Sequence, residues 1–558
     1  MIYEATQVDT TGTSPWSYDS LGRLAAATNG AGSTLGFSYD LAGRPTTLAY
    51  PGGTQNVTRT YDGAGRLRTV ADWSARTTTF SYDADSDLVG TAYPNGTAAS
   101  VTVDRTGAPT GTALTAGAAT LASLAYARDG AGQVASQSGT GVGQPSETYG
   151  YSALEQLKTL NGTATFAYDA ADDLTRLRGT AQAFDAASQI TSSTPDGGAA
   201  TAYGYDARGN RTSATPPGAA ATAYGYDQES RLVNFNAGAA TYAYDGNGLR
   251  SSKTAGGTTT AFTWDPSGGL PLVVKAATTA YVYGPGGLPL EQVAADGTTQ
   301  WFFHDQLGST RALTDSTGAV VATRAYDPYG KVIASTGTAS TPFGFAGEWT
   351  DAESGFVYLR ARFYDPATGQ FLTRDPLVSV TRSPYGYVEG NPLNGTDPAG
   401  LSAWGWAKKH ALEIAVVTVV AAVVACTVSV VCGLAVAGAV SAVSVVAGNA
   451  MLLGAAGIGT AGAIARALGG APGCSEPAEG SPAALDATPG GRIYSAHYLE
   501  DTGPVRNIPG SVVDEVIDHG QVVERLADRT IYYQQANDMT VVQSETTGKI
   551  MSVRKGAP

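Results

Sequence analysis

Short stretches of alternating apolar and polar residues, each ending in a Tyr-Asp pair, recur through about the first 335 residues of this 558-residue chain. Examples are TLGFSYD at residues 34–40 and ATAYGYD at residues 221–227. A period of two is the pattern of a half-buried β-strand, and Asp followed by Gly favours a tight turn. At about 3.3 Å per residue, a unit of roughly twenty residues holds two short strands and two turns. Each unit is therefore predicted to be a β-hairpin.

The Tyr-Asp units form a regular internal repeat. SYDSLGRL at Tyr18, SYDLAGRP at Tyr39 and TYDGAGRL at Tyr61 follow one another in steps of 21 and 22 residues. Further copies are centred on Tyr82, Tyr168, Tyr205, Tyr226 and Tyr244, with degenerate ones at Phe184, Trp264 and Tyr326. A single hairpin cannot bury its aromatic face, so the units are expected to stack into one continuous antiparallel sheet. The regular spacing argues against Tyr-rich turns scattered through an ordinary β domain.

Composition supports many turns joined by short strands: the chain has 71 glycines, and only 15% of its residues are charged. A net charge of −14 excludes a chain that coats nucleic acid through its overall field, although a local basic face remains compatible. Three cysteines, Cys426, Cys432 and Cys474, provide neither a disulfide framework nor a CxxC pair. The first residues, MIYEATQVDT, do not resemble a conventional signal peptide, which leaves another export route or a longer natural N-terminus.

The end of the array carries the most specific motifs. GFVYLRARFYDPATGQFLTRDPL (residues 355–377) and SPYGYVEGNPLNGTDPAGL (residues 383–401) resemble the core-terminating segment of the Rhs/YD-repeat family, and the resemblance covers roughly residues 15–401. It implies a mainly β fold in which a spiralling antiparallel YD-repeat shell encloses a C-terminal toxic domain. The array of about 320 residues is shorter than is usual in that family. The chain is therefore expected to be a fragment or to close with another chain.

The resemblance also implies that the core cuts its own backbone by aspartyl chemistry. Asp375 of TRDPL and Asp397 of TDPAGL are the candidate carboxylate pair, Arg374 is the candidate supporting charge, and the scissile bond follows Leu401. Two adjacent carboxyl groups share a proton, so that one polarises the peptide carbonyl while the other activates water. The alternative is that Asp-Pro merely starts a turn, as is expected for the other Asp-Pro pairs of the chain, at Asp265, Asp327 and Asp365.

A run of 52 residues without a charge, 414–465, follows the boundary and is predicted to be helical. A bilayer core of ~30 Å needs about 20 apolar residues per helix, so the run is long enough for two spans. Trp404 and Trp406 lie where interfacial anchors are expected. Three interpretations stay open: a hairpin that inserts in a target membrane, a segment packed within the shell, and a permanent anchor. The Pro- and Gly-rich residues 471–491 are typical of a linker.

The last seventy residues suggest a small α+β domain. PGSVVDEVIDHG (509–520) predicts a short helix that ends at Gly520, and RTIYYQQ, MTVVQSE and KIMSVRK predict a three-stranded antiparallel sheet. This layout resembles the barnase-like, colicin-like and RelE-like ribonucleases among polymorphic toxins. The resemblance implies that His497 is the general base. His519, Arg525, Arg529, Thr530, Tyr533, Ser552 and Arg554 are the further candidates for proton transfer, charge neutralisation and phosphate orientation.

Alternatives remain for the tail. A lone surface histidine is more often inert than catalytic, and His519 beside Gly520 also suits a helix C-terminus. A zinc deaminase is not favoured, because HxE and PCxxC motifs are absent. The alternative to a toxin enzyme is that the tail is a binding module, or an inert end on a surface protein.

Together these features predict a repeat shell (1–345), a core-terminating segment with the cleavage site (346–401), an apolar helical segment (402–470), a linker (471–491) and a toxin domain (492–558). No cofactor or metal is expected. The family resemblance implies that the protein is secreted or displayed at the cell surface and delivered into target cells. It also implies four partners: a cognate immunity protein, the RNA of a target cell, a component of a secretion apparatus and a target-cell membrane.

Overall fold

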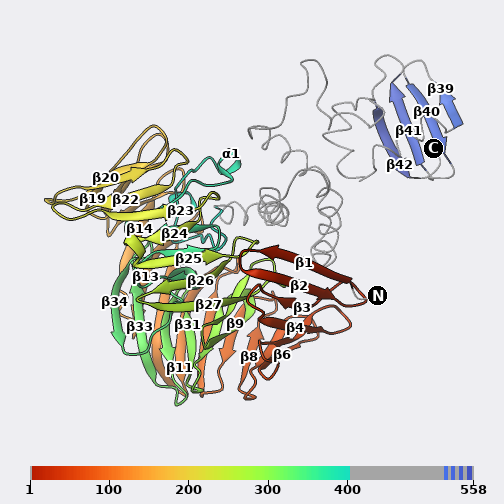
Figure 1. The fold of residues 1–558 in the computed structure, drawn as a ribbon, viewed down its shortest axis with the longest axis horizontal. Coiled ribbons are helices and arrows are strands. Elements are labelled where there is room, and N and C mark those ends of the chain that lie inside the picture. Colours follow the sequence, from red (N-terminus) through yellow and green to blue (C-terminus); the bar gives the residue numbers. More distant parts are fainter. Residues whose placement is uncertain (1–2, 402–520, 526–528, 535–538, 545–549, 556–558) are drawn as a thin grey trace. The chain divides into compact units, whose positions relative to one another are not determined.

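The computed structural model describes residues 3–401 and four strands near the C-terminus, 521–525, 529–534, 539–544 and 550–555 (Figure 1). The chain divides into two compact units, Met1–Ala450 and Met451–Pro558. All the paired strands are antiparallel, and each sheet follows the order of the sequence. The predicted mainly β, antiparallel fold class is therefore confirmed.

The first sheet has sixteen strands. They are β1 (Tyr3–Asp9), β2 (Gly12–Tyr18), β3 (Leu24–Thr28), β4 (Thr34–Tyr39), β5 (Pro45–Ala49), β6 (Asn56–Tyr61), β7 (Leu67–Ala71), β8 (Thr77–Tyr82), β9 (Leu88–Ala92), β10 (Thr97–Val103), β11 (Pro109–Ala116), β12 (Ala119–Arg128), β13 (Val134–Thr140), β14 (Glu147–Tyr151), β15 (Leu157–Leu160) and β16 (Thr163–Ala164).

The second sheet has eighteen strands. They are β17 (Phe166–Tyr168), β18 (Leu174–Leu177), β19 (Thr180–Phe184), β20 (Ile190–Pro195), β21 (Thr201–Tyr205), β22 (Arg211–Thr215), β23 (Thr222–Tyr226), β24 (Leu232–Phe235), β25 (Ala240–Tyr244), β26 (Arg250–Ala255), β27 (Thr258–Asp265), β28 (Leu272–Ala276), β29 (Thr279–Tyr283), β30 (Pro289–Val293), β31 (Thr299–His304), β32 (Thr310–Thr314), β33 (Val320–Tyr326) and β34 (Val332–Gly337).

Residues 338–401, which follow β34 and include the predicted core-terminating segment (346–401), fold into a third, small sheet with short helices. From here on, the core-terminating segment means residues 338–401. Its elements are β35 (Trp349–Thr350), β36 (Val357–Leu359), β37 (Arg362–Asp365), β38 (Gln370–Phe371), helix α1 (Val378–Thr381) and the 3-10 turns η3 (Phe345–Gly347) and η4 (Val388–Gly390). Two further 3-10 turns, η1 (Asn236–Gly238) and η2 (Pro285–Gly287), lie in the second sheet.

In the repeats that carry an arginine after the turn, one set of contacts explains the motif. Asp40 Oδ1 accepts hydrogen bonds from the backbone N–H groups of Ala42 and Arg44, and Asp40 Oδ2 accepts one from Arg44 Nε at 2.7 Å. The Arg44 guanidinium then lies 4.6 Å from the centre of the Tyr61 ring, which belongs to the next repeat. Tyr61 in turn donates to the carbonyl of Pro45 at 2.7 Å. Asp therefore fixes the turn, and Arg joins it to the following Tyr.

The two large sheets contact each other through residues far apart in sequence. Tyr93 Oη donates to the carbonyl of Phe302 at 2.7 Å, and Asn95 donates to the carbonyl of Asp315 at 2.8 Å. A single buried hydrophobic cluster includes residues of both sheets and of the core-terminating segment. Strands β30 and β32 are buried at every position. The array thus folds back on itself, and part of the second sheet has no exposed face.

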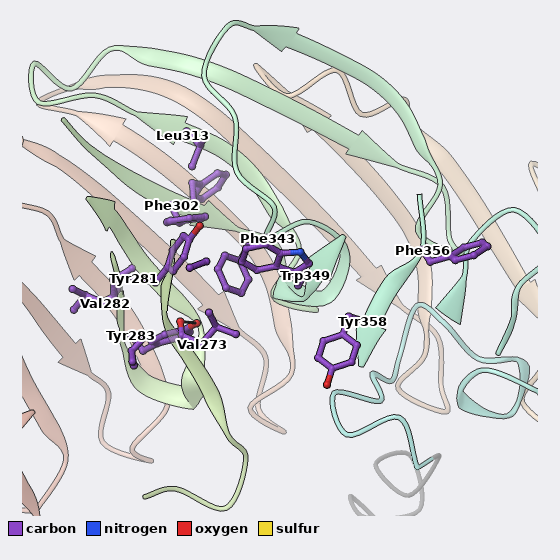
Figure 2. Close-up of a cluster of buried hydrophobic side chains, with 14 of the residues drawn as sticks. Val273, Tyr281, Val282, Tyr283, Phe302, Leu313, Phe343, Trp349, Phe356 and Tyr358 are labelled. Atoms are coloured by element: carbon purple, nitrogen blue, oxygen red, sulfur yellow. Dashed lines mark hydrogen bonds between the residues drawn. The ribbon is translucent and has the colours of Figure 1, made fainter. Parts of the chain in front are cut away.

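Phe343 is at the centre of the aromatic contacts that join the core-terminating segment to the second sheet (Figure 2). Its ring lies 4.9 Å from that of Tyr281, 6.4 Å from that of Phe302 and 5.6 Å from that of Trp349, all in edge-to-face arrangements. Such pairs add to the free energy gained by burial. The segment predicted to terminate the repeats is therefore part of the core.

Buried ion pairs also attach this segment. Arg250 of β26 pairs with Asp351 at 2.7 Å, and neither side chain is exposed to solvent. The Arg250 guanidinium lies 4.4 Å from the Tyr358 ring centre and 4.5 Å from that of Phe262. Lys253 contacts the same carboxylate at 3.2 Å. Removing Asp351 would leave the Arg250 charge buried among aromatic rings without its counter-charge.

The C-terminal unit contains a four-stranded antiparallel sheet of β39 (Gln521–Arg525), β40 (Arg529–Gln534), β41 (Met539–Ser544) and β42 (Ile550–Lys555). The three predicted strands are confirmed, and β39 is an additional strand. It was missed because QVVER is only five residues long and lies directly after Gly520, where the predicted helix ends.

Several sequence predictions lie outside the described residues: the helix at 509–519, the linker at 471–491 and the apolar run at 414–465. Within the described residues, no helix combines the length and apolar character needed to cross a membrane.

Asp351→Asn is expected to lower the free energy of unfolding by about 3 to 5 kcal/mol, because Arg250 would lose its buried counter-charge. Urea unfolding followed by tryptophan fluorescence measures this effect. Asp196→Asn is the matched control, since Asp196 pairs with Arg176 at the surface, with 61% of the Asp side chain exposed. The control should cost less than about 1 kcal/mol. Equal losses in the two variants would contradict a structural role for the buried pair.

Candidate active site at the end of the shell

Three parts of the core-terminating segment meet at one buried position. Arg362 begins β37, Asp375 precedes α1, and Asp397 begins the turn that ends at Gly400. The backbone N–H of Asp375 donates to the carbonyl of Pro384 at 2.8 Å, and that of Gly400 donates to the carbonyl of Asp397 at 3.2 Å. The strand and two backbone-fixed turns therefore bring together side chains up to 35 residues apart.

The Arg362 guanidinium lies between the two predicted carboxylates. Its Nη2 atom is 3.3 Å from Asp375 Oδ2 and 3.5 Å from Asp397 Oδ2, and all three side chains are at most 2% exposed. Its Nε atom donates to the carbonyl of Gly400, and its carbon Cζ lies 3.6 Å from the centre of the Phe371 ring. Burial lowers the pKa of Arg362, and the two carboxylates oppose that shift.

Each carboxylate is also held by the backbone. Asp375 Oδ1 accepts from the N–H of Leu377 at 2.7 Å, and its Oδ2 accepts from Thr381 Oγ1 at 3.1 Å. Asp397 Oδ1 accepts from the N–H of Leu401 at 2.9 Å. One carboxylate is therefore hydrogen-bonded to the residue that precedes the predicted scissile bond.

The guanidinium changes the electrostatics expected from the sequence. The sequence predicts two carboxyl groups side by side, whereas the structure also places the positive charge of Arg362 within 3.5 Å of both. Arg362 keeps its own charge at neutral pH. The arrangement can therefore provide a carboxylate base and a fixed positive charge next to one peptide segment.

Arg374, the predicted supporting charge, lies on the surface, and the guanidinium that contacts both carboxylates is that of Arg362. A second arginine missed from the sequence is Arg360, which donates to Glu348 at 2.7 Å and to the carbonyl of Pro398 at 2.6 Å. The available signal was the pair of arginines two residues apart within the aromatic-rich motif FVYLRARFY. Charged side chains in an aromatic-rich stretch are expected to be buried only when they are paired with opposite charges or hydrogen-bond acceptors.

Gly400 is required by the packing of this turn. Its φ is +69°, a region that side-chain-bearing residues rarely adopt, and a Cβ atom there would overlap the carbonyl oxygen of Leu359. The turn thus lies directly against the end of β36, which places Leu401 beside Asp397.

The other candidate residues are in the C-terminal unit. Arg525 ends β39, Arg529, Thr530 and Tyr533 lie on β40, and Ser552 and Arg554 lie on β42. The strand register places Tyr533, Thr540 and Arg554 in one cross-strand row. His497 and His519 lie outside the described residues.

Comparisons with known proteins identify the repeat region. The Teneurin YD-shell family model matches residues 178–287 and 275–387, and the RHS Repeat model matches residues 18–55. The tRNA nuclease WapA of Bacillus subtilis (strain 168) is 36% identical over 114 residues, 19% of this chain and 5% of the relative. The probable deoxyribonuclease RhsB of Dickeya dadantii (strain 3937) is 48% identical over 59 residues, 10% of this chain and 4% of the relative.

A solved structure shows the same fold. The crystal structure of TcdB2-TccC3 without its hypervariable C-terminal region aligns with 72% of this chain and 23% of that chain, with a TM-score of 0.54 and 19% identity. The chain thus corresponds to a small part of the length of each of these proteins. The likeness supports the fold of the shell.

Gly400→Ala is expected to lower the melting temperature more than Gly355→Ala. Both glycines have a positive φ, a conformation that costs a residue with a side chain about 1–2 kcal/mol. The added Cβ atom would meet backbone atoms at position 400 but open space at position 355. The overlap with Leu359 should add about 1–3 kcal/mol. Thermal unfolding of the two variants measures the difference. Equal melting temperatures would show that the turn does not pack against β36 as described.

Proposed function

Because the chain is an Rhs/YD-repeat protein, we propose that its core cleaves its own backbone after Leu401 and releases a C-terminal toxin that cleaves RNA. The observation that carries the first half of this proposal is the contact of one buried guanidinium with Asp375 and Asp397, together with the hydrogen bond from Leu401 to Asp397. A catalytic group must lie within reach of the reacting bond, and the hydrogen bond from Leu401 supports this role for Asp397, while Asp375 is linked to Asp397 through Arg362.

In the proposed reaction, one carboxylate takes a proton from a water molecule, whose oxygen attacks the carbonyl carbon of Leu401. The other carboxyl group, in its protonated form, donates to the carbonyl oxygen as negative charge develops there. The C–N bond to Ser402 then breaks, and the leaving nitrogen takes the proton that the first carboxylate removed from the water molecule. Arg362 holds both carboxyl groups in place throughout.

The second half of the proposal rests on the tail. The printed names of the two relatives describe a tRNA nuclease and a probable deoxyribonuclease, so nuclease activity is common to both, while the nucleic acid differs. RNA is favoured here by the residues of the tail itself. Metal-free RNA cleavage needs a base, an acid and cations, and His497, His519 and the arginines Arg525, Arg529 and Arg554 are suited to these roles.

The alternative function is that of a non-enzymatic binding or adhesion protein of the cell surface with an inert tail. The hydrogen bond between Leu401 and the buried Asp397, which contacts the Arg362 guanidinium, favours the proteolytic function over this alternative. Delivery of a toxin would require a secretion apparatus and a cognate immunity protein in the producing cell. The apolar run 414–465 would either be enclosed or insert in the target membrane.

The purified wild-type chain is expected to separate into residues 1–401 and 402–558, as measured by intact mass. Asp375→Asn and Asp397→Asn should each slow cleavage by about 10²-fold or more, because acid–base catalysis contributes about 10²–10⁴-fold. Arg362→Gln should slow it more than Arg374→Gln. Asp196→Asn, at the surface, serves as the control for loss of a carboxylate. A wild-type chain that stays intact, or is cut elsewhere, would refute the proposed autoproteolysis.

Expression of residues 490–558 in a bacterium is expected to arrest growth and to degrade RNA, as seen on a gel of total RNA. His497→Ala should abolish both effects, because the proposed base would be lost. His519→Ala should have a smaller effect if His519 only stabilises a helix end. Growth without impairment would favour the binding function, and degraded DNA with intact RNA would leave a toxin of a different specificity.

A further inference from the structure

Arg360 occupies a backbone conformation that is unusual for its side chain. It is the first residue of the two-residue turn between β36 and β37, with φ of +57°. Turn positions of this kind are commonly taken by Gly, Asn or Asp. A bulky residue held at positive φ stores backbone strain, and such strain persists where the side chain is needed.

The Arg360 side chain connects three parts of the structure. Its Nε donates to the carbonyl of Pro271 at 2.9 Å, and its Nη1 donates to Glu348 Oε2 at 2.7 Å and to the carbonyl of Pro398 at 2.6 Å. Pro271 directly precedes β28 of the second sheet, whereas Pro398 lies within the Asp397–Gly400 turn. Only 11% of the Arg360 side chain is exposed. A single guanidinium therefore joins the large sheet to the turn that holds Asp397.

The backbone next to Arg360 reinforces this connection. The N–H of Ala361 donates to the carbonyl of Ala399 at 3.3 Å, and the following residue is Arg362 of the candidate active site. Any shift of Arg360 would therefore move both the Asp397–Gly400 turn and the guanidinium between the carboxylates.

We propose that Arg360 is a positioning residue for autoproteolysis: it holds the Asp397–Gly400 turn in the reactive position only when the loop before β28 is in place. This inference rests on the proposed function. It implies that the bond after Leu401 becomes reactive once the second sheet has assembled around the core-terminating segment, so that an incompletely folded shell does not release its C-terminal part.

The test uses the full chain carrying Arg360→Gly together with Glu348→Gln. Glycine relieves the positive φ, and the second substitution avoids a buried carboxylate without a partner. Cleavage is expected to slow at least tenfold. Arg382→Gly is the matched control, because Arg382 also has a positive φ (56°) in the same segment, but its side chain is exposed. The control should cleave at the wild-type rate. A double variant that cleaves at the wild-type rate would overturn the proposal.

Two further measurements separate positioning from general destabilisation. Arg360→Lys keeps a charge opposite Glu348, but its single terminal nitrogen cannot replace the separate Nε and Nη1 donors, so cleavage should be intermediate. A wild-type rate for Arg360→Lys would argue against the proposal even if the double variant did not fold.

Hydrogen exchange is measured in chains that also carry Asp375→Asn, which keeps the backbone intact. The Leu401 amide should exchange faster in the double variant, while β30 and β32 stay protected. Unchanged exchange at Leu401 would refute the positioning role. If the wild-type chain never cleaves, the proposed function fails, and this exchange measurement still decides whether Arg360 positions the turn.

Discussion

The buried Arg362 guanidinium, in contact with both Asp375 and Asp397, is the interaction on which the end of this structure depends. Three charged side chains can be buried away from water only when they form ion pairs and hydrogen bonds with one another. Since Arg362 also donates to the carbonyl of Gly400, the same group fixes the strand, the loop before α1 and the last described turn. Through Asp397, which accepts a hydrogen bond from the Leu401 N–H, this network also holds the residue before the proposed scissile bond.

The same principle attaches the core-terminating segment to the second sheet. Arg211 of β22 pairs with Asp365 at 2.8 Å, and Arg250 of β26 pairs with Asp351 at 2.7 Å. In both pairs the repeat sheet supplies the arginine and the terminating segment supplies the aspartate. Buried pairs of this kind do not necessarily add stability, but they are strongly destabilising when broken, so they favour one register of the segment on the sheet. In the repeats that carry an arginine, a partly exposed Asp-Arg-Tyr set joins one turn to the next, as in Asp40, Arg44 and Tyr61.

Much of the shell could be predicted from the sequence because its strands and turns are determined by residues that are close together in the chain. The Tyr-Asp turns, the alternation of the strands and the strand order depend on residues within one or two repeats. The approach of Asp375 to Asp397 was suggested by motif resemblance, and the structure brings both to one guanidinium. The identity of that guanidinium could not be predicted, because Arg374 is the arginine next to Asp375 in the sequence, whereas the fold leaves Arg374 exposed and buries Arg362 beside both carboxylates. The contact of the array with its own terminating segment is also a long-range property, since it joins Tyr281 to Phe343.

A pair of double-mutant cycles tests the central role of Arg362 most directly. The free energies of unfolding are compared for Arg362→Gln, for Asp375→Asn and Asp397→Asn, and for the two corresponding double variants. If one guanidinium holds both carboxylates, each cycle gives a coupling energy of about 0.5–3 kcal/mol, the range measured for residues in contact. Strictly additive effects in both cycles would contradict the account, because Arg362 and the two aspartates would then be independent neighbours.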